Sequence, residues 1–395
     1  MQNFDSLLLP EKSKVGLNYY NIPKYQTYHH NDKFFCQKID SSTGVPAQPH
    51  ISNSNIDFEL DEMFGMLINN YVLSFRITEN NVSTINLICG PCLIESVQII
   101  CMGKTICEYD GFLLYILNCL HVDNSTSEKY TLISSGINHS DFSYGTTTAI
   151  GTGTFKDYYI NLYNILSNLS FNKMALKSKI TIRIKFRKNI EENSKESQAM
   201  FSNVCLYVYG HTISQKLSNS ILFSEVDYKV NAFQKFTVDL PNGITQNVKQ
   251  SVLLQGLENE VSLFMFFIRK KNDTLSKFCT TYSVESFYVE DSRNLNITNN
   301  IDYDADLLKY LLNFKLFPGT TFFNNQNIYL FSYAYDPVAT IYNNKHMAHH
   351  TFKNCKLFFL PNVSSLGAHE LVFYYLSPAI LKLWKNGMAL EFDYY

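Results

Sequence analysis

Short runs of alternating apolar and polar residues dominate this chain. Residues 179–186 read KITIRIKF, with isoleucine or phenylalanine at every second position, and the runs YVLSFRIT at 71–78 and NVCLYVYGHTI at 203–213 are similar. A period of two residues places one set of side chains on a single face, which is the pattern of a half-buried β-strand. Polar turns separate these runs, so the sequence predicts an all-β fold built from many short strands.

One stretch of this strand pattern recurs after 190 residues. Residues 94–99 (IESVQI) match residues 284–289 (VESFYV). Further pairs at the same offset lie upstream, within or beside apolar strand runs: Cys89 with Cys279, and Leu73 with Leu263. A fixed spacing between similar segments indicates a repeat, and it predicts two copies of one domain in tandem.

A short helical pattern follows in both copies. After a polar turn, GFLLYILNCL at 111–120 resembles ADLLKYLLNF at 305–314, and the leucine pairs in these segments match at an offset of 194 residues. A weaker match upstream pairs residues 56–60 with residues 236–240 at an offset of 180. The shared order of strand, turn and helix predicts one short helix in each copy.

The repeat suggests where the domains begin and end. Residues 1–50 hold four of the ten prolines and show little periodicity, so we expect an extended N-terminal arm there. The first barrel then covers residues 51–213 and the second covers residues 234–395, with a linker at 214–233. Strand runs close the second copy at 327–335, 355–361, 370–376 and 388–395. Many short strands with one brief helix per copy favour two tandem jelly-roll barrels.

Composition and charge narrow the function. Of the 395 residues, 46% are hydrophobic, 15% aromatic and 17% charged, which allows two domains that each bury a core. The formal net charge is −2, whereas a protein that wraps nucleic acid through its phosphates needs a positive stripe. We therefore expect no sequence-specific nucleic-acid binding.

No export signal is visible in the sequence. The start, MQNFDSLLLPEKSK, lacks a basic region followed by a long apolar run. The longest apolar stretches, 261–268 and 371–384, are too short or too interrupted for a membrane span. We expect synthesis in the cytosol without a signal peptide. In that reducing compartment, the nine cysteines would act as small core residues.

The strongest candidate for chemistry is Cys89-Gly90-Pro91-Cys92, the active-site sequence of thioredoxins. Redox chemistry needs the first thiol at a helix N-terminus, where the dipole lowers its pKa, within a βαβ unit. Here the strand runs TINLI and LIESVQII lie on either side, and the second copy keeps only Cys279. We therefore interpret Gly90-Pro91 as a turn between strands, flanked by reduced, inert cysteines.

The histidines offer two weaker candidates. His346, His349 and His350 cluster, but a metal site would need a carboxylate or cysteine at a defined spacing, and a polar loop explains them equally well. His369-Glu370 opens like a zinc-protease HExxH motif, yet Phe373 replaces the second histidine.

The aspartates at 302–306 imitate a calcium-binding loop. Asp302, Asp304 and Asp306 have the required alternation, but the loop glycine is missing and Asn313 replaces the glutamate at the twelfth position. An acidic first turn that stabilises the following helix is the better explanation.

Two glycine-containing segments complete the candidates. Gly103-Lys104-Thr105 resembles the end of a phosphate-binding loop, but Gln98 stands where the leading glycine should be, so a turn between strands is favoured. Gly151-Thr152-Gly153 lies in a Gly/Thr-rich stretch that is typical of a loop. We predict no catalytic, cofactor-binding or metal-binding residue and no cofactor, and hence a protein that is not an enzyme.

The architecture resembles the double-jelly-roll major capsid proteins of tailless icosahedral DNA viruses, the lineage of the adenovirus hexon and of tectivirus, virophage and polinton-like coats. The local likeness is a strand at Glu95–Cys101, the turn Met102-Gly103-Lys104, a return strand with Ile106, and a helix from Phe112. Virophage and polinton-like coats often have Asn-Gly-Lys at this turn. Met102 departs from that pattern, so the likeness rests more on architecture than on the motif.

The resemblance implies a structural role. Trimers of two-barrel subunits would present six similar barrels and form pseudo-hexagonal capsomers of an icosahedral shell. The implied partners are further copies of the chain, neighbouring capsomers, and penton and minor capsid proteins. An internal membrane is a further candidate, and the implied location is the virion. The arm at 1–50 would then contact neighbouring subunits.

Two other classes of protein compete with this resemblance. A bicupin enzyme is also a tandem jelly roll, but its metal site needs a His-x-His pair, which this chain lacks. A carbohydrate- or receptor-binding spike or fibre-head protein stays open as the alternative function. Such a protein should expose an aromatic-lined groove and should not assemble into pseudo-hexagonal tiles.

Overall fold

The structure is a computed structural model of the chain. It describes residues 34–41, 55–60, 66–79, 85–87, 90–121, 148–150, 155–167, 171–172, 178–186, 199–212, 226–271, 281–298, 303–312, 316–317, 327–342, 348–384 and 387–392. Among these residues, no helix combines the length and apolar character that a membrane span requires.

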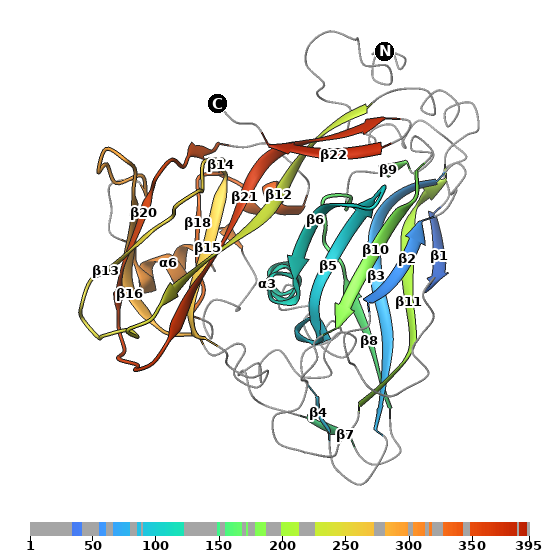
Figure 1. Ribbon diagram of the computed structural model, residues 1–395, viewed down its shortest axis with the longest axis horizontal. Helices are drawn as coiled ribbons and strands as arrows, with labels where there is room; N and C mark the ends of the chain where they lie inside the picture. Colours follow the sequence, from blue (N-terminus) through green and yellow to red (C-terminus); the bar gives the residue numbers. More distant parts are fainter. Residues whose placement is uncertain are drawn as a thin grey trace.

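The first half of the chain forms two antiparallel sheets (Figure 1). One has the strand order β1-β11-β3-β8, with β9 paired to β3, and the other has the order β2-β10-β5-β6. A small ribbon, β4–β7, lies beside them. The elements are β1 (Phe34–Asp40), β2 (Asn55–Leu60), β3 (Met66–Glu79), β4 (Ile85–Leu87), the 3-10 helix η1 (Gly90–Leu93), β5 (Ile94–Cys101), β6 (Lys104–Asp110), α3 (Gly111–His121), β7 (Thr148–Ile150), β8 (Phe155–Asn161), β9 (Phe171–Asn172), β10 (Ile180–Phe186) and β11 (Ala199–Thr212).

The second half repeats this arrangement. Its sheets have the orders β12-β21-β15-β18, with β22 paired to β21, and β13-β20-β16-β17, and β14–β19 forms a ribbon. The elements are β12 (Val226–Leu240), β13 (Gln250–Leu253), β14 (Glu260–Val261), β15 (Leu263–Lys270), β16 (Val284–Glu290), β17 (Tyr303–Asp304), α6 (Ala305–Leu311), β18 (Tyr329–Ser332), α8 (Pro337–Tyr342), β19 (His350–Thr351), β20 (Lys356–Pro361), β21 (His369–Trp384) and β22 (Gly387–Phe392).

The two halves have the same topology. In one layer, β1, β11, β3 and β8 correspond to β12, β21, β15 and β18. In the other layer, β2, β10, β5 and β6 correspond to β13, β20, β16 and β17. In each half, a five-stranded sheet and a four-stranded sheet form two layers, which is the arrangement of a jelly roll. The predicted all-β fold of two tandem jelly-roll barrels is confirmed.

The match between residues 94–99 and 284–289 is confirmed at the level of single residues. Val97 of β5 points into the first core and pairs with Tyr109 of β6. Phe287 of β16 points into the second core and pairs with Tyr303 of β17. The first pair of equivalents is 190 residues apart and the second is 194 residues apart. The sequence offsets therefore mark equivalent positions in the two barrels.

The upstream strand match is shifted by one residue. Phe75 of β3 stacks on its cross-strand partner Tyr158, and Phe266 of β15 stacks in the same way on Tyr329. These stacked pairs are equivalent and give an offset of 191, so Leu73 corresponds to Phe264 rather than to Leu263. Because strand side chains alternate between faces, a shift of one residue moves a side chain to the other face.

The weak match at an offset of 180 was wrong. Residues 56–60 lie in β2, whereas residues 236–240 lie in β12, the counterpart of β1. Both segments alternate apolar and polar residues, and this period is common to all half-buried strands. Alternation alone therefore cannot identify equivalent strands.

Two of the predicted domain boundaries need correction. Residues 34–40 were assigned to the arm, but they form β1, which pairs along its length with β11 of the first barrel. Residues 226–233 were assigned to the linker, but they are the first half of β12, paired with β21. The segment FFCQKID at 34–40 alternates too weakly to be recognised without its partner strand, whereas VDYKVNAF at 226–233 does alternate and its strand signal was missed. Residues 1–33 lie outside the described residues, so the role of the arm stays a prediction.

Burial differs between corresponding sheets. In the first barrel, β11 buries Leu206 and Val208 but leaves Tyr207 and Tyr209, on the opposite face, half-buried. In the second barrel, β15 is buried on both faces from Leu263 to Ile268, and β21 is buried from Leu371 to Ala379. A strand that is buried on both faces must be covered on its outer side by another part of the chain.

Candidate functional site

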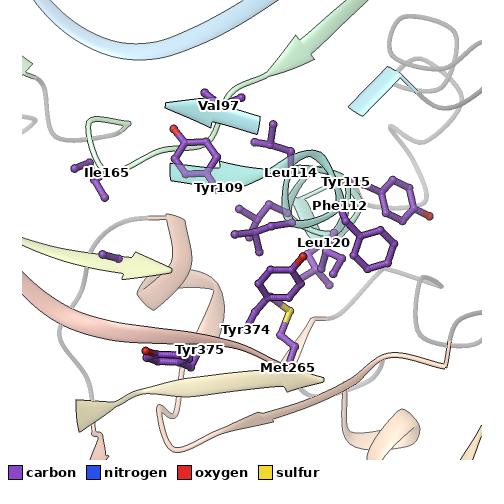
Figure 2. Close-up of a cluster of buried hydrophobic side chains, with 14 of the residues drawn as sticks. Val97, Tyr109, Phe112, Leu114, Tyr115, Leu120, Ile165, Met265, Tyr374 and Tyr375 are labelled. Carbon is purple, nitrogen blue, oxygen red and sulfur yellow. The ribbon is translucent and has the colours of Figure 1, made fainter. Parts of the chain in front are cut away.

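The helix α3 is what covers the second barrel. It lies between the two barrels, with strands of the first barrel on one side and strands of the second on the other (Figures 1 and 2). Every residue from Gly111 to Leu120 is buried. A helix that is apolar on all sides is suited to such a position. Its one polar residue in this run, Asn118, donates to the carbonyl oxygens of Leu114 and Asn161.

The first residue of α3 has to be glycine. A Cβ atom at Gly111 would lie 2.2 Å from the carbonyl oxygens of both Pro91 and Ile94. The start of the helix therefore rests directly on η1, the segment that holds Gly90 and Pro91. In the second barrel the equivalent residue is Ala305, so the helix there starts without the glycine that the first barrel requires.

Asp110 joins the two barrels through polar contacts. Its Oδ1 accepts a hydrogen bond from the backbone N–H of Leu113, which caps α3. From the second barrel, the Tyr374 hydroxyl donates to both carboxylate oxygens at 2.8 Å, and Lys235 Nζ lies 2.8 Å from Oδ2. Burial alone would raise the pKa of Asp110, but Lys235, the Leu113 amide and Tyr374 together hold this pKa below its usual value.

Apolar and aromatic contacts surround this polar bridge. The rings of Phe112 and Phe267 lie 4.5 Å apart between centroids, and the rings of Tyr163 and Tyr342 lie 5.2 Å apart. The Tyr342 hydroxyl donates to the carbonyl oxygen of Leu117 at 2.6 Å. Met265 and Tyr374 also point toward α3 (Figure 2). Since each pair joins residues from different barrels, the contacts fix the barrels against each other.

A small cavity remains at one side of this interface. It has a volume of about 40 Å³ and is lined by both barrels, with Leu113, Leu117 and Tyr163 on one side and Phe233 and Tyr342 on the other. Such a volume holds a few water molecules rather than a cofactor. We therefore treat the cavity as part of the interface.

The corresponding helix of the second barrel has a different environment. Asp304 accepts from the backbone N–H of Leu307 and so caps α6, as Asp110 caps α3. Leu308 is buried against its own barrel, but Leu307 and Tyr310 are 47% and 53% exposed. Figure 1 shows β15 between α6 and α3. The two helices are therefore equivalent in their barrels, but α3 is buried from Gly111 to Leu120, whereas α6 leaves Leu307 and Tyr310 about half-exposed.

Comparisons with known proteins identify solved structures that share this architecture. No family model and no curated protein matches the sequence. Among solved structures, a quasi-atomic model of the PBCV-1 virus capsid matches with a TM-score of 0.71 at 12% identity, covering 97% of this chain and 99% of that chain. The Faustovirus major capsid protein matches with a TM-score of 0.68 at 8% identity, over 89% and 90% of the two chains. The Sputnik virophage structure matches at 0.59 and 8% identity, over 99% and 92%.

The protein has the double-jelly-roll fold of these viral capsid proteins. The agreement extends over nearly the full length of both chains, so it includes the placement of the second barrel beside the first. The low identity means that the likeness is one of fold. The predicted resemblance to the double-jelly-roll lineage is confirmed at this level.

Within the double jelly roll, the last three residues of the thioredoxin-like tetrapeptide, Gly90 to Cys92, lie in a 3-10 helix. Cys89 lies outside the described residues. Gly90–Leu93 form η1, which connects β4 to β5 and packs under the start of α3. The interpretation as a connection between strands is confirmed, and the inert state of the two thiols stays a prediction. The cysteines whose side chains are described are free thiols: Cys36, Cys101, Cys107, Cys119, Cys205 and Cys355.

The histidine candidates fall at separate places in the double jelly roll. His346 lies outside the described residues, and His349 Nε2 lies 2.9 Å from Glu260 Oε2. His350 stacks on Tyr333, and burial lowers its pKa. His369 is fully buried in β21, where its ring nitrogens lie near the Gly367 carbonyl and the Ser365 hydroxyl. In the described part of the chain, no three metal-ligating side chains come together.

The remaining candidates have structural positions. Asp304 caps α6, which confirms the helix-stabilising interpretation of the acidic cluster for this residue. Asp302 lies outside the described residues, and the side chain of Asp306 is not among those described. Met102 and Gly103 both have positive φ values, 51° and 74°, and form the two-residue turn of the β5–β6 hairpin. Residues 151–154 lie outside the described residues.

Sequence reasoning missed the residues that join the barrels. Asp110, Lys235 and Tyr374 lie far apart in the sequence and match no motif. One signal was available: aspartate precedes the helix in both copies, at positions 110 and 304, with the same offset as the leucines. The additional helix α8 also had a signal, because Asp336 caps it and Pro337 is its first residue.

Proposed function

We propose that this protein is the major capsid subunit of a virus, and that three copies form a pseudo-hexagonal capsomer of an icosahedral shell. The observation that carries the proposal is the pair of equivalent jelly rolls fixed side by side, in a fold shared over nearly the full chain with viral capsid proteins. Its role is structural and not enzymatic. Its location is the virion.

The packing between the two barrels supports a role as a rigid subunit of a shell. A shell subunit needs a fixed shape, and the Asp110 bridge and the aromatic contacts of α3 hold the two barrels as one unit. Three such units place six similar barrels around a threefold axis and approximate sixfold packing. The tandem barrels differ in sequence, so each can make its own contacts inside the capsomer.

The partners of this subunit follow from the proposed shell. Further copies of the chain complete the capsomer, and neighbouring capsomers meet its edges. Penton and minor capsid proteins would fill the fivefold vertices and the joints between capsomers. An internal membrane, where present, would lie beneath the inner face. No sequence-specific contact with nucleic acid is part of the proposal.

Mass measurement and electron microscopy of the purified protein test the proposal. Light scattering should give three times the chain mass of 45.6 kDa, and images should show particles with six barrels in a pseudo-hexagonal outline. Monomers or dimers alone at high protein concentration would contradict the capsomer. A trimer with separated heads on a stalk and glycan binding would instead support the spike or fibre-head alternative.

A further inference from the structure

The turn that follows β12 contains an Asn-Gly pair. Pro241, Asn242 and Gly243 come directly after Leu240, the last residue of β12, and the backbone N–H of Gly243 donates to the Leu240 carbonyl oxygen. Asn242 is exposed and keeps a negative φ, whereas the φ of Gly243 is +77°. Proline at the second position and glycine at the fourth are typical of a type I turn.

The fold requires glycine at position 243. A Cβ atom there would lie 2.3 Å from the Ser365 carbonyl oxygen and 3.2 Å from the Gly367 carbonyl oxygen. The positive φ is a second constraint, because residues with a side chain rarely adopt it. The next residue, Ile244, exchanges two backbone hydrogen bonds with Ser365, at 3.0 and 2.9 Å. The turn is therefore held tightly against the loop between β20 and β21.

This glycine makes the preceding asparagine chemically reactive. Asparagine is one of the thermolabile residues of proteins, because the backbone nitrogen of the next residue can attack the carbonyl carbon of its side chain. A side chain on that next residue hinders the attack, and glycine has none. In this turn, the Gly243 N–H is held by a long hydrogen bond of 3.4 Å, so its nitrogen is only weakly restrained. The close packing that demands Gly243 thus creates a labile Asn242.

We propose that Asn242 is a site of spontaneous deamidation in the folded protein. The Gly243 nitrogen loses its proton and bonds to Cγ of Asn242. The bond between Cγ and the side-chain nitrogen then breaks, and ammonia leaves with that proton. Water opens the resulting five-membered succinimide ring. Opening at the Cγ carbonyl gives aspartate, and opening at the main-chain carbonyl gives isoaspartate, in which the backbone runs through the former side chain.

The reaction is independent of the proposed capsid function. It takes place within one turn of one chain and consumes only water, so it needs neither a partner nor a binding surface. Its effect on a shell would follow from time alone, since a subunit that is not replaced after assembly collects the modified turn. Asn242 would then mark the age of the particle.

Isoaspartate should weaken the attachment of the turn. It adds one carbon atom to the backbone directly before Gly243, where no room exists for even a single Cβ atom beside the Ser365 carbonyl oxygen. The longer chain must either press Gly243 against this oxygen or pull Ile244 away from its two hydrogen bonds with Ser365. The modified protein should therefore be less stable than the original one.

Peptide mapping of protein incubated in neutral buffer tests the site. Trypsin releases residues 236–249 as one peptide, which contains both Asn242 and Asn247. Asn247 is also exposed but is followed by valine, so it serves as the internal control. Asn242 should progressively show the mass change from an amide NH2 to OH, at a rate that rises with the hydroxide concentration, because the deprotonated nitrogen attacks. Asn247 should stay unchanged.

The same chain unfolded in guanidinium chloride is the positive control. Conversion of Asn242 in the unfolded chain but not in the folded chain would overturn the proposal, because it would show that the turn protects this residue. Equal conversion of Asn247 would also overturn it, since glycine would then play no part.

Thermal unfolding before and after incubation tests the structural consequence. The Tm of the wild type should fall as isoaspartate accumulates. The variant Asn242→Gln should keep its Tm, because glutamine cyclises far more slowly and its side chain is exposed in the same turn. A wild-type protein that contains isoaspartate at this position with an unchanged Tm would overturn the predicted loss of stability and leave the site itself confirmed.

Discussion

The helices α3 and α6 occupy equivalent places in two similar barrels but have opposite surroundings. Each follows the same strand and is capped by an aspartate, Asp110 or Asp304, at the same offset. The helix α3 is buried on all sides between the barrels, whereas α6 exposes Leu307 and Tyr310. Equivalent elements of the two barrels therefore differ in burial, because α3 lies at the contact between the barrels.

The sequences of the helices reflect this difference. GFLLYILNCL has a single polar side chain, Asn118, and starts with the glycine that its close packing requires. ADLLKYLLNF carries Asp306 and Lys309 within the same length. A fully apolar helix needs apolar neighbours on every side, whereas an amphipathic one can keep a face in water or in a reversible contact. The composition of α3 therefore fits a permanent contact between the barrels, and that of α6 fits a helix with one partly solvated face.

Truncation of the equivalent leucines should give the largest difference in stability between the two helices. Leu113→Ala should lower the free energy of unfolding by about 2–5 kcal/mol, because it leaves a cavity in a closed interface. Leu307→Ala should lower it by less than about 0.5 kcal/mol in the monomer, because the side chain is already half in water. Urea denaturation at low protein concentration measures both values. Equal losses would show that α6 is covered as α3 is.

The first helical residue provides the second test. Gly111→Ala should destabilise the protein by about 1–3 kcal/mol, because the new methyl group overlaps the carbonyl oxygens of Pro91 and Ile94 and forces α3 away from η1. The reverse change, Ala305→Gly, should cost at most about 1 kcal/mol through helix propensity. Thermal unfolding of the two variants gives the comparison. A neutral Gly111→Ala would mean that α3 approaches η1 less closely than described.

The polar bridge provides the third test. Asp110→Asn keeps a helix-capping side chain but removes the charge that Lys235 faces, so we expect a loss of about 1–2 kcal/mol. Asp239→Asn is the matched control, since Asp239 pairs with Lys271 at 2.6 Å on the surface of the second barrel alone. It should change the stability by less than about 0.5 kcal/mol. Similar losses in both variants would show that the bridge contributes no more than a surface pair.

Acid should lower the stability of the folded protein by protonating Asp110, and this effect should be smaller than those of the substitutions above. The folded state lowers the pKa of Asp110, so its contribution is complete above the unfolded pKa of about 4 and is lost as the pH falls through the folded pKa. Between about pH 5 and about pH 3, the wild type should therefore lose more stability than Asp110→Asn. Urea midpoints across this range measure the difference. Parallel pH profiles would exclude Asp110 as a source of acid sensitivity.

Local patterns predicted much of the fold. The alternation in KITIRIKF and YVLSFRIT identified β10 and β3, and the offset between Val97 and Phe287 identified equivalent strands. These features depend on side-chain alternation and on turn residues, which act over a few positions. The helix pair was also recognisable, because the change from strand to helix periodicity occurs at the same place in both copies.

The partners across the chain could not be predicted in this way. The strand β1 was assigned to an arm because its seven residues become a strand only by pairing with β11, more than 160 positions later. The shift between Leu73 and Phe264 is a register property that pairing decides.

The sequence predicted two β-barrels in tandem with a helix at the same place in each, because strand and helix periods are local properties of the chain, but it missed the additional helix α8 of the second barrel. The complete burial of α3 depends instead on contacts between residues far apart in the sequence. Asp110 meets Lys235 and Tyr374 across separations of 125 and 264 residues. No local pattern encodes such a contact, because it depends on how the two complete barrels pack against each other.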